Sequence, residues 1–125
     1  MGVVLAVAFG GGVGSLARYF LAGAIQPAGT TFPWGIFAVN ISGGFLMGLI
    51  VEASALKLNL APEMRAFLTV GILGGYTTFS TFSLDSALLL QRGEYTLAAG
   101  YMIGSVVLSI LALFAGLWLV RALYA

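Results

Sequence analysis

Three long stretches of this chain carry no charged residue, and each is close to or above the length that spans a lipid bilayer. They cover residues 19–51, 66–84 and 95–120, and a helix needs roughly 20 residues to cross the hydrocarbon core. The chain is 61% hydrophobic and 7% charged, with a mean hydropathy of +1.10, whereas soluble domains are roughly one quarter charged. A soluble domain of 125 residues could not bury so much apolar surface, because small folds leave much of their surface in water. The sequence therefore predicts a membrane protein.

Breaks in the apolar pattern divide the chain into four spans with short connections. A turn-forming run follows Ile25, a proline suited to a first helical turn precedes Trp34, and an Arg-Gly-Glu turn starts at Arg92. Short connections require neighbouring helices to run antiparallel. The predicted fold is an all-α membrane protein, a single domain over residues 1–125, with four transmembrane helices at approximately 2–25, 34–52, 63–90 and 95–123.

Every predicted span contains two glycines four residues apart. Because residues four apart share one helix face, each pair lets another backbone approach closely. We expect ordinary helix packing for the first, second and fourth of these pairs. The glycine-rich run 10–15 lacks the lysine and the spacing of nucleotide-binding loops, so no nucleotide site is predicted. The pairs are Gly10 and Gly14, Gly44 and Gly48, Gly71 and Gly75, and Gly100 and Gly104.

Composition excludes several classes of function. The chain has no cysteine and no histidine, which removes disulfides, thiol chemistry, haem-type ligation and most general-base designs. A net charge of +1 indicates no nucleic-acid partner. The intramembrane carboxylate candidates, Asp85 and Glu52, have no nucleophile or histidine partner, so we do not expect an enzyme. The N-terminus predicts neither a removable signal peptide nor a myristoylation site.

The third span carries the most informative motif, a double glycine followed by five serine and threonine side chains between Gly74 and Ser83. Lipid cannot hydrogen-bond free backbone groups, so an unwound turn at this depth must be buried in protein or line a watery path. Helix ends at such a break direct partial charges at their surroundings. We therefore expect a broken helix that handles an ion.

Several residues could line a path for an anion. Phe79 and Phe82 are three apart and share one face, and the positive edges of phenyl rings can hold an anion without a fixed charge. Asn40, in the uncharged second span, is either an interhelical clamp or a donor in a pore. A polar stripe on the fourth span completes the predicted wall; it consists of Tyr101, Ser105 and Ser109.

The basic residues are distributed almost evenly between the two sides of the predicted bundle. One side has Lys57, Arg65 and Arg121, and the other has Arg92, together with Arg18 if the first helix places it near that end. Orientation follows lysine and arginine counts near span ends. This count leaves two alternatives open. The chain either inserts in both orientations, so that a dimer of oppositely oriented copies can form, or it has a single topology.

The motifs together resemble the Fluc (CrcB-type) fluoride channels over the whole chain. The resemblance implies an antiparallel, dual-topology homodimer with two pores, in the inner membrane of a prokaryote, that exports fluoride passively and gives fluoride resistance. The motifs that carry it are Gly11-Gly12-Val13-Gly14 with Arg18-Tyr19, Pro33-Trp34-Gly35 leading to Val39-Asn40, and the run from Gly74 to Ser83.

The resemblance also implies roles for individual residues. Phe79 and Phe82 would line the fluoride paths with Asn40 as the pore amide, and the fourth-span stripe of Tyr101, Ser105 and Ser109 would complete them. The backbone carbonyls of Gly74 and Thr77 would hold a central sodium ion at the dimer interface, which suits a hard cation. Arg18 and Asp85 would lie near the pore mouths.

One departure from the family pattern concerns the second span. Relatives usually have a Gly-Thr-Leu run where this chain has Gly35-Ile36-Phe37, so the threonine hydroxyl is missing at Ile36. Either that hydroxyl is dispensable or a neighbour such as Ser42 replaces it.

Two other functions remain as alternatives. A small multidrug resistance exporter is also a four-span, dual-topology dimer, but its proton coupling needs a carboxylate in the first span, and residues 1–25 contain none. In a non-transporting assembly subunit, the glycines and aromatic residues would serve packing alone.

Overall fold

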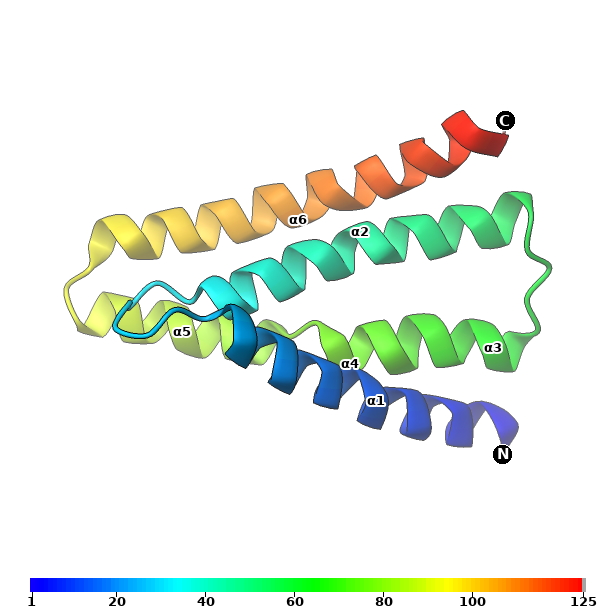
Figure 1. The fold of residues 1–125 in the computed structure, drawn as a ribbon, viewed down its shortest axis with the longest axis horizontal. Coiled ribbons are helices and arrows are strands. Elements are labelled where there is room, and N and C mark those ends of the chain that lie inside the picture. Colours follow the sequence, from blue (N-terminus) through cyan, green and yellow to red (C-terminus); the bar gives the residue numbers. More distant parts are fainter. Residues whose placement is uncertain (125) are drawn as a thin grey trace.

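The chain forms a bundle of helices without any strand among residues 1–124, the part that this computed structural model describes. Ala125, the last residue of the predicted domain, lies outside the described residues. Figure 1 shows that successive long segments reverse direction and that both chain ends lie at the same end of the bundle. The elements, in order, are α1 (Gly2–Ile25), α2 (Trp34–Leu56), α3 (Pro62–Ala66), η1 (Phe67–Leu73), α4 (Gly74–Tyr76), α5 (Phe79–Gln91) and α6 (Tyr95–Tyr124).

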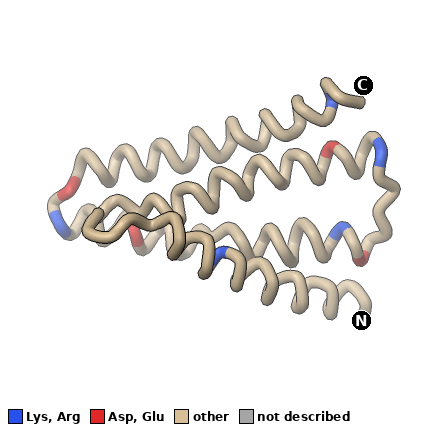
Figure 2. Tube along the Cα trace, in the orientation of Figure 1, with Lys and Arg blue, Asp and Glu red and all other residues tan. Residues whose placement is uncertain are grey.

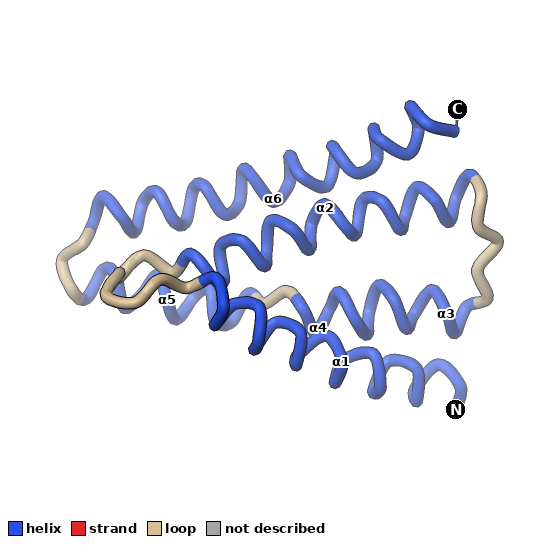
Figure 3. The backbone as a smooth tube through the Cα atoms, viewed as in Figure 1, coloured by secondary structure: helices blue, strands red, loops and turns tan. Residues whose placement is uncertain are grey.

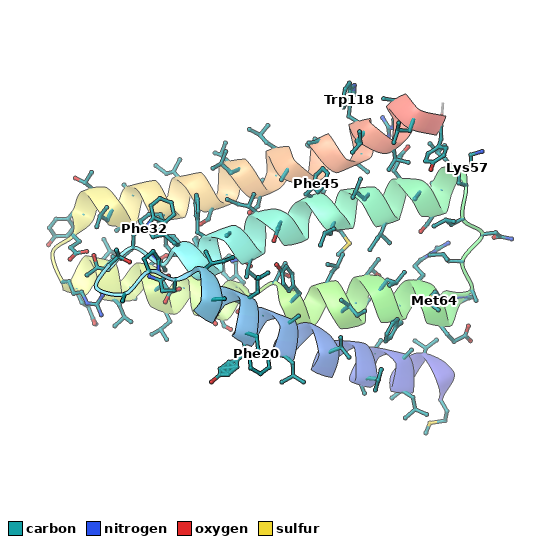
Figure 4. All side chains as sticks on the ribbon, viewed as in Figure 1. Phe20, Phe32, Phe45, Lys57, Met64 and Trp118 are labelled. Carbon is teal, nitrogen blue, oxygen red and sulfur yellow. The ribbon has the colours of Figure 1, made fainter. Side chains whose placement is uncertain are left out.

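Four helical segments are long and apolar enough to cross a membrane. They are Gly2–Ile25, Trp34–Leu56, Pro62–Gln91 and Tyr95–Tyr124, so the prediction of four spanning helices is confirmed. The second helix continues to Leu56, four residues beyond the predicted end at Glu52. Large side chains such as Phe20 and Trp118 point away from the bundle (Figure 4) and are mostly exposed. In a membrane, lipid covers these side chains.

The third spanning segment is built from four elements. After α3, the seven residues of η1 form a π-helix, and α4 is a single short turn. Thr77 and Thr78 then have extended backbone dihedrals, and α5 begins at Phe79. Figure 3 shows this non-helical stretch between α4 and α5. The Thr78 hydroxyl accepts a hydrogen bond from the Thr81 N–H at 3.1 Å, so Thr78 is the N-cap that starts α5.

Glycine contacts hold the long helices together in two layers. A Cβ on Gly14 would overlap the carbonyl of Ile72, and a Cβ on Gly48 would overlap that of Leu113. These contacts place α1 against η1 and α4, and α2 against α6. Within the chain, Gly100 of the fourth pair does not have the expected packing role, since no atom lies within 4 Å of its Cβ position. Gly116 instead provides a close approach of α6 to α2, since a Cβ there would overlap the Phe45 carbonyl.

Charged residues gather at the two ends of the bundle, and the single basic residue of α1 lies partway along its helix (Figure 2). At the end with the chain termini, Arg121 Nε donates to Glu52 Oε1 at 2.7 Å, and Glu52 is only 8% exposed. Lys57 lies over the ring of Tyr124, with Nζ 5.3 Å from the centroid. Both contacts join α2 to α6.

Candidate functional site

Asn40 on α2 forms hydrogen bonds with both backbone groups of Thr78 in the non-helical stretch. Its Nδ2 donates to the Thr78 carbonyl at 3.2 Å, and its Oδ1 accepts from the Thr78 N–H at 2.9 Å. The first of these bonds uses one of the two amide hydrogens. Asn40 is thus a clamp between helices, and one N–H remains for a further acceptor.

A cavity of about 430 Å³ lies beside this clamp, between α2, α5 and α6. It collects five of the six predicted pore residues together with Thr77. Tyr101 is the predicted pore residue that does not line it. The lining consists of Asn40, Gly43, Gly44, Met47, Thr77, Thr78, Phe79, Phe82, Ser105, Val106, Ser109, Ile110 and Leu113.

The hydroxyl of Ser105 is the most unusual polar group in this cavity. Ser105 is 5% exposed, and its Oγ has no hydrogen-bond partner among the described residues. Buried hydroxyls normally have a partner, because leaving one unpaired costs about 1–3 kcal/mol. Ser86, on α5, shows the usual arrangement, since its buried hydroxyl donates to the Phe82 carbonyl at 2.8 Å. Ser105 therefore has an unused donor at a cavity wall.

Aromatic rings continue from this cavity toward the bundle end with the α5–α6 turn. The rings of Phe79 and Phe82 are 5.5 Å apart between centroids and tilted by 50°, and Phe82 is 5.2 Å from Tyr101. Phe79 is 77% exposed in the single chain, whereas Tyr101 is completely buried. The two phenylalanines therefore touch, as their spacing predicts, but only Phe82 is packed inside the chain.

Asp85 contacts the last of these aromatic rings, Tyr101. Its Oδ2 accepts a hydrogen bond from the Tyr101 hydroxyl at 3.1 Å. Asp85 also lines a second cavity, of about 340 Å³, together with Ile36 and Arg92. Because the Tyr101 hydroxyl donates its hydrogen to Asp85, that hydrogen is not free for an anion in this arrangement.

Ser42 does not take the place of the missing threonine hydroxyl. Ser42 Oγ donates to the Val39 carbonyl at 3.0 Å and lies 2.9 Å from the Tyr76 hydroxyl. It lines neither of the two cavities. Ile36 therefore presents an apolar wall beside Asp85, and Ser42 does not supply a hydroxyl there.

Arg18 reaches the non-helical stretch from α1. Its Nη1 donates to the Thr77 carbonyl at 3.2 Å, although Arg18 lies seven residues before α1 ends at Ile25. A helix rises about 1.5 Å per residue, so this residue lies about 10 Å inside the helix end. Without Arg18 at that end, the basic residues near the two ends number three against one, with Arg92 alone on its side.

The carbonyls of Gly74 and Thr77, the predicted sodium ligands, have both lost the donors that a continuous helix would provide. The Thr78 N–H donates to Asn40 instead of Gly74, and the Thr81 N–H donates to the Thr78 hydroxyl instead of Thr77. Freed carbonyl oxygens are the ligands that hard monovalent cations use in membrane proteins. The Gly74 carbonyl fits a sodium ion directly, whereas the Thr77 carbonyl already accepts from Arg18 Nη1 and has one lone pair left for a cation.

Thr78 is the functional residue that sequence reasoning did not single out. Two signals in the sequence indicate it: a hydroxyl side chain directly before an apolar helical segment is typical of an N-cap, and a threonine pair favours extended backbone. Its partner on another helix, Asn40, is 38 positions away, and no local pattern connects the two.

Comparisons with known proteins agree on one family. The family model described as "CrcB-like protein, Camphor Resistance (CrcB)" matches residues 5–117. The chain is 54% identical over 121 residues to "Fluoride-specific ion channel FluC 1" of Nitrobacter hamburgensis, covering 96% of both proteins. It is 53% identical over 119 residues to "Fluoride-specific ion channel FluC" of Agrobacterium fabrum, covering 94% of this chain and 95% of the relative. The protein of the same name from Rhodospirillum centenum is 50% identical over the full length of both chains. Because the family model and these relatives span nearly all of the sequence, the chain belongs to the CrcB-like protein family.

Proposed function

We infer that this protein is a fluoride-specific ion channel that releases cytoplasmic fluoride and so gives fluoride resistance. Relatives that are about 50% identical over almost their entire length are named as such channels. The four apolar helices make it a multi-pass integral protein of the bacterial plasma membrane. It is a passive pore and not an enzyme.

The unpaired hydroxyl of Ser105 is the observation that best supports an anion path. It lies in one cavity with Asn40, which retains a free N–H, and with the phenyl rings of Phe79 and Phe82. Neutral donors and ring edges attract an anion without binding it so tightly that it cannot leave. No charged side chain lines this cavity among the described residues, so no fixed positive charge there would hold an anion too tightly.

The driving force is the membrane potential. Hydrogen fluoride crosses lipid uncharged and dissociates in a more neutral cytoplasm, where the anion is retained. An inside-negative potential then drives fluoride outward by about 2.3 kcal/mol per elementary charge per 100 mV. Export therefore needs a selective pore and no coupling machinery.

We further propose that two copies assemble as an antiparallel homodimer around a sodium ion. Two carbonyls, from Gly74 and Thr77, are too few to surround a hard cation, whereas two chains supply four. The exposed ring of Phe79 and the open side of the pore cavity support a second copy against this face. Sodium would supply a fixed positive charge that holds the two non-helical stretches together, while Asn40 and Arg18 orient the carbonyls.

Fluoride efflux from liposomes tests the proposed channel. Purified protein should release fluoride rapidly and chloride at the background rate. Ser105→Ala should lower fluoride efflux about tenfold, because a donor facing the dehydrated anion is lost. Ser86→Ala is the matched control, since Ser86 is equally buried but donates to its own helix. Equal efflux from both variants would remove Ser105 from the path, and chloride release as fast as fluoride release would contradict the proposed selectivity.

A further inference from the structure

A third cavity, of about 490 Å³, opens at the end of the bundle that carries the chain termini. It lies between α2 and the third spanning segment, and none of the sequence motifs predicts it. Its walls are mostly apolar, and a single charged residue, Arg65, lines it. The lining consists of Met47, Val51, Ser54, Ala55, Arg65 and Thr69.

Arg65 is an exposed basic residue at this end that pairs with no carboxylate among the described residues. Arg121 is paired with the buried Glu52, and Lys57 lies over Tyr124. Within residues 1–124, the Arg65 side chain takes part in no salt bridge or hydrogen bond. The neighbouring carboxylate of Glu63 packs toward α1, where its Cγ is 3.3 Å from the Cβ position of Gly2.

The polar groups of the cavity select for a negative ion at Arg65. The hydroxyls of Ser54 and Thr69 donate to the backbone carbonyls of Ile50 and Arg65 at 2.6 and 2.9 Å. Their hydrogens are therefore used, and the guanidinium is the one free donor group in the lining. A guanidinium offers five N–H donors and no acceptor, which matches an anion and rejects a cation.

Met47 connects this cavity to the pore cavity, because its side chain lines both. An anion at Arg65 would thus lie in a cavity that shares the Met47 wall with the space that holds Asn40 and Ser105. Clefts with one sign of charge and low-dielectric walls focus the electric field and raise the local concentration of counter-ions. The apolar walls therefore strengthen the effect of the single arginine.

We propose that this cavity is an outer binding basin for small anions, with Arg65 as its fixed positive charge and Met47 as the boundary to the pore. The basin rests on the proposed channel function and adds a site before the narrow path. Arg65 raises the rate at which fluoride reaches the pore, and the neutral donors beyond Met47 carry the selectivity. Halide selectivity is consequently independent of Arg65.

The first test compares three variants at several ionic strengths. Arg65→Gln should lower fluoride efflux about threefold or more at 10 mM salt, and the deficit should shrink at 300 mM, because salt screens a charge that acts over distance. Arg65→Lys should retain most of the rate. Lys57→Gln removes a charge from the same end without touching the cavity and should remain near the wild-type rate. A salt-independent deficit, or equal losses in Arg65→Gln and Lys57→Gln, would overturn the proposal.

The second test detects the anion site by thiol labelling and needs no flux measurement. The chain has no native cysteine, so Thr69→Cys provides a single thiol in the cavity. It should react with negatively charged methanethiosulfonate reagent at least tenfold faster when Arg65 is present than in the Arg65→Gln background. Phe20→Cys, on the outer face of α1, should stay unlabelled in liposomes. A Thr69→Cys thiol that does not react, or reacts equally in both backgrounds, would refute the basin even if the wild-type protein conducts fluoride. Wild-type protein without selective fluoride efflux would refute the channel instead.

Discussion

Asn40 and Thr78 exchange two hydrogen bonds across 38 positions of sequence, so that one amide side chain supplies the Thr78 N–H with a partner where the third helix is interrupted and gives the Thr78 carbonyl a second one. Lipid offers no substitute for these partners. The pairing explains how the chain tolerates extended backbone in the middle of an apolar segment. It also gives a side chain on α2 control over the geometry of the residues that follow, beginning with Phe79.

Replacing Asn40 should therefore affect stability as well as flux. In Asn40→Leu, the Thr78 N–H loses its partner and the Thr78 carbonyl loses its second donor, and an unpaired buried N–H costs about 1–3 kcal/mol. Thermal unfolding in detergent should occur several degrees lower, and fluoride efflux should be lost. Ser54→Ala serves as the control, because the Ser54 hydroxyl donates to its own helix. A variant Asn40→Leu with unchanged melting temperature would contradict the clamp.

The two phenylalanines should differ in their effect on the fold but not on flux. Isoleucine retains apolar bulk and removes the ring quadrupole, so efflux should fall at least tenfold in both Phe79→Ile and Phe82→Ile. Phe82 packs against Tyr101 and Phe79 is exposed in the single chain, so Phe82→Ile alone should lose about 0.5–1.5 kcal/mol of stability within the chain. Efflux normalised to intact dimer by size exclusion measures the first effect, and thermal melting measures the second. Unchanged flux per dimer would assign both rings to packing.

The sodium site is expected to depend on the backbone and not on the Thr77 hydroxyl. That hydroxyl donates to the Leu73 carbonyl at 2.9 Å, and a serine hydroxyl can make the same bond. Thr77→Ser should therefore assemble, bind sodium with affinity within about threefold of wild type, and conduct. The measurement is sodium-dependent thermal stabilisation of the purified protein. Loss of this stabilisation in Thr77→Ser, with the fold intact, would require ligation by the side chain.

Glycine substitutions should separate helix contacts from open positions. Gly48→Ala places a methyl group against the Leu113 carbonyl on α6, and such overpacking costs about 1–3 kcal/mol. Gly100→Ala meets open space and should be neutral or slightly stabilising, since alanine favours helix by about 1 kcal/mol over glycine. Thermal melts of the two variants decide this. Strong destabilisation by Gly100→Ala would place that face in an interface with a second copy.

Topology reporters test the antiparallel arrangement directly. A reporter fused after the last helix should be found on both sides of the membrane if the chain inserts both ways. With Arg18 inside the bundle, the three-to-one distribution of basic residues alone favours the end with Lys57, Arg65 and Arg121 in the cytoplasm. A reporter found exclusively in the cytoplasm would show that this charge bias prevails, and would exclude the dual-topology dimer.

Sequence patterns predicted the four spans and the contacts between side chains that are close in sequence. Three of the four spanning helices follow from charge-free stretches of sufficient length, because hydrophobic length is a property of consecutive residues. The first, which contains Arg18, follows from its apolar composition and the turn after Ile25. The contact of Phe79 with Phe82 follows equally from helical spacing. The closeness of Ser105 and Asn40 could be expected only from the family resemblance, since they come from α6 and α2 and share no local pattern.

Other features were decided by contacts between distant segments. Arg18 would extend toward the end of α1 by its position alone, but the freed carbonyl of Thr77 binds it within the bundle. Gly100 and Gly116 both lie on α6, but only Gly116 meets the backbone of α2. By sequence alone, Ser42 could replace the missing hydroxyl, but in the structure its Oγ lies 2.9 Å from the Tyr76 hydroxyl.

By itself, the sequence determined that this chain crosses a membrane four times and which segments do so, because the bilayer acts on each segment through its own hydrophobicity and length. The tertiary structure alone decided which polar groups remain unpaired. A hydrogen bond between segments requires both partners to meet in space, so the clamp at Asn40 and the free hydroxyl of Ser105 exist only once the four helices are packed.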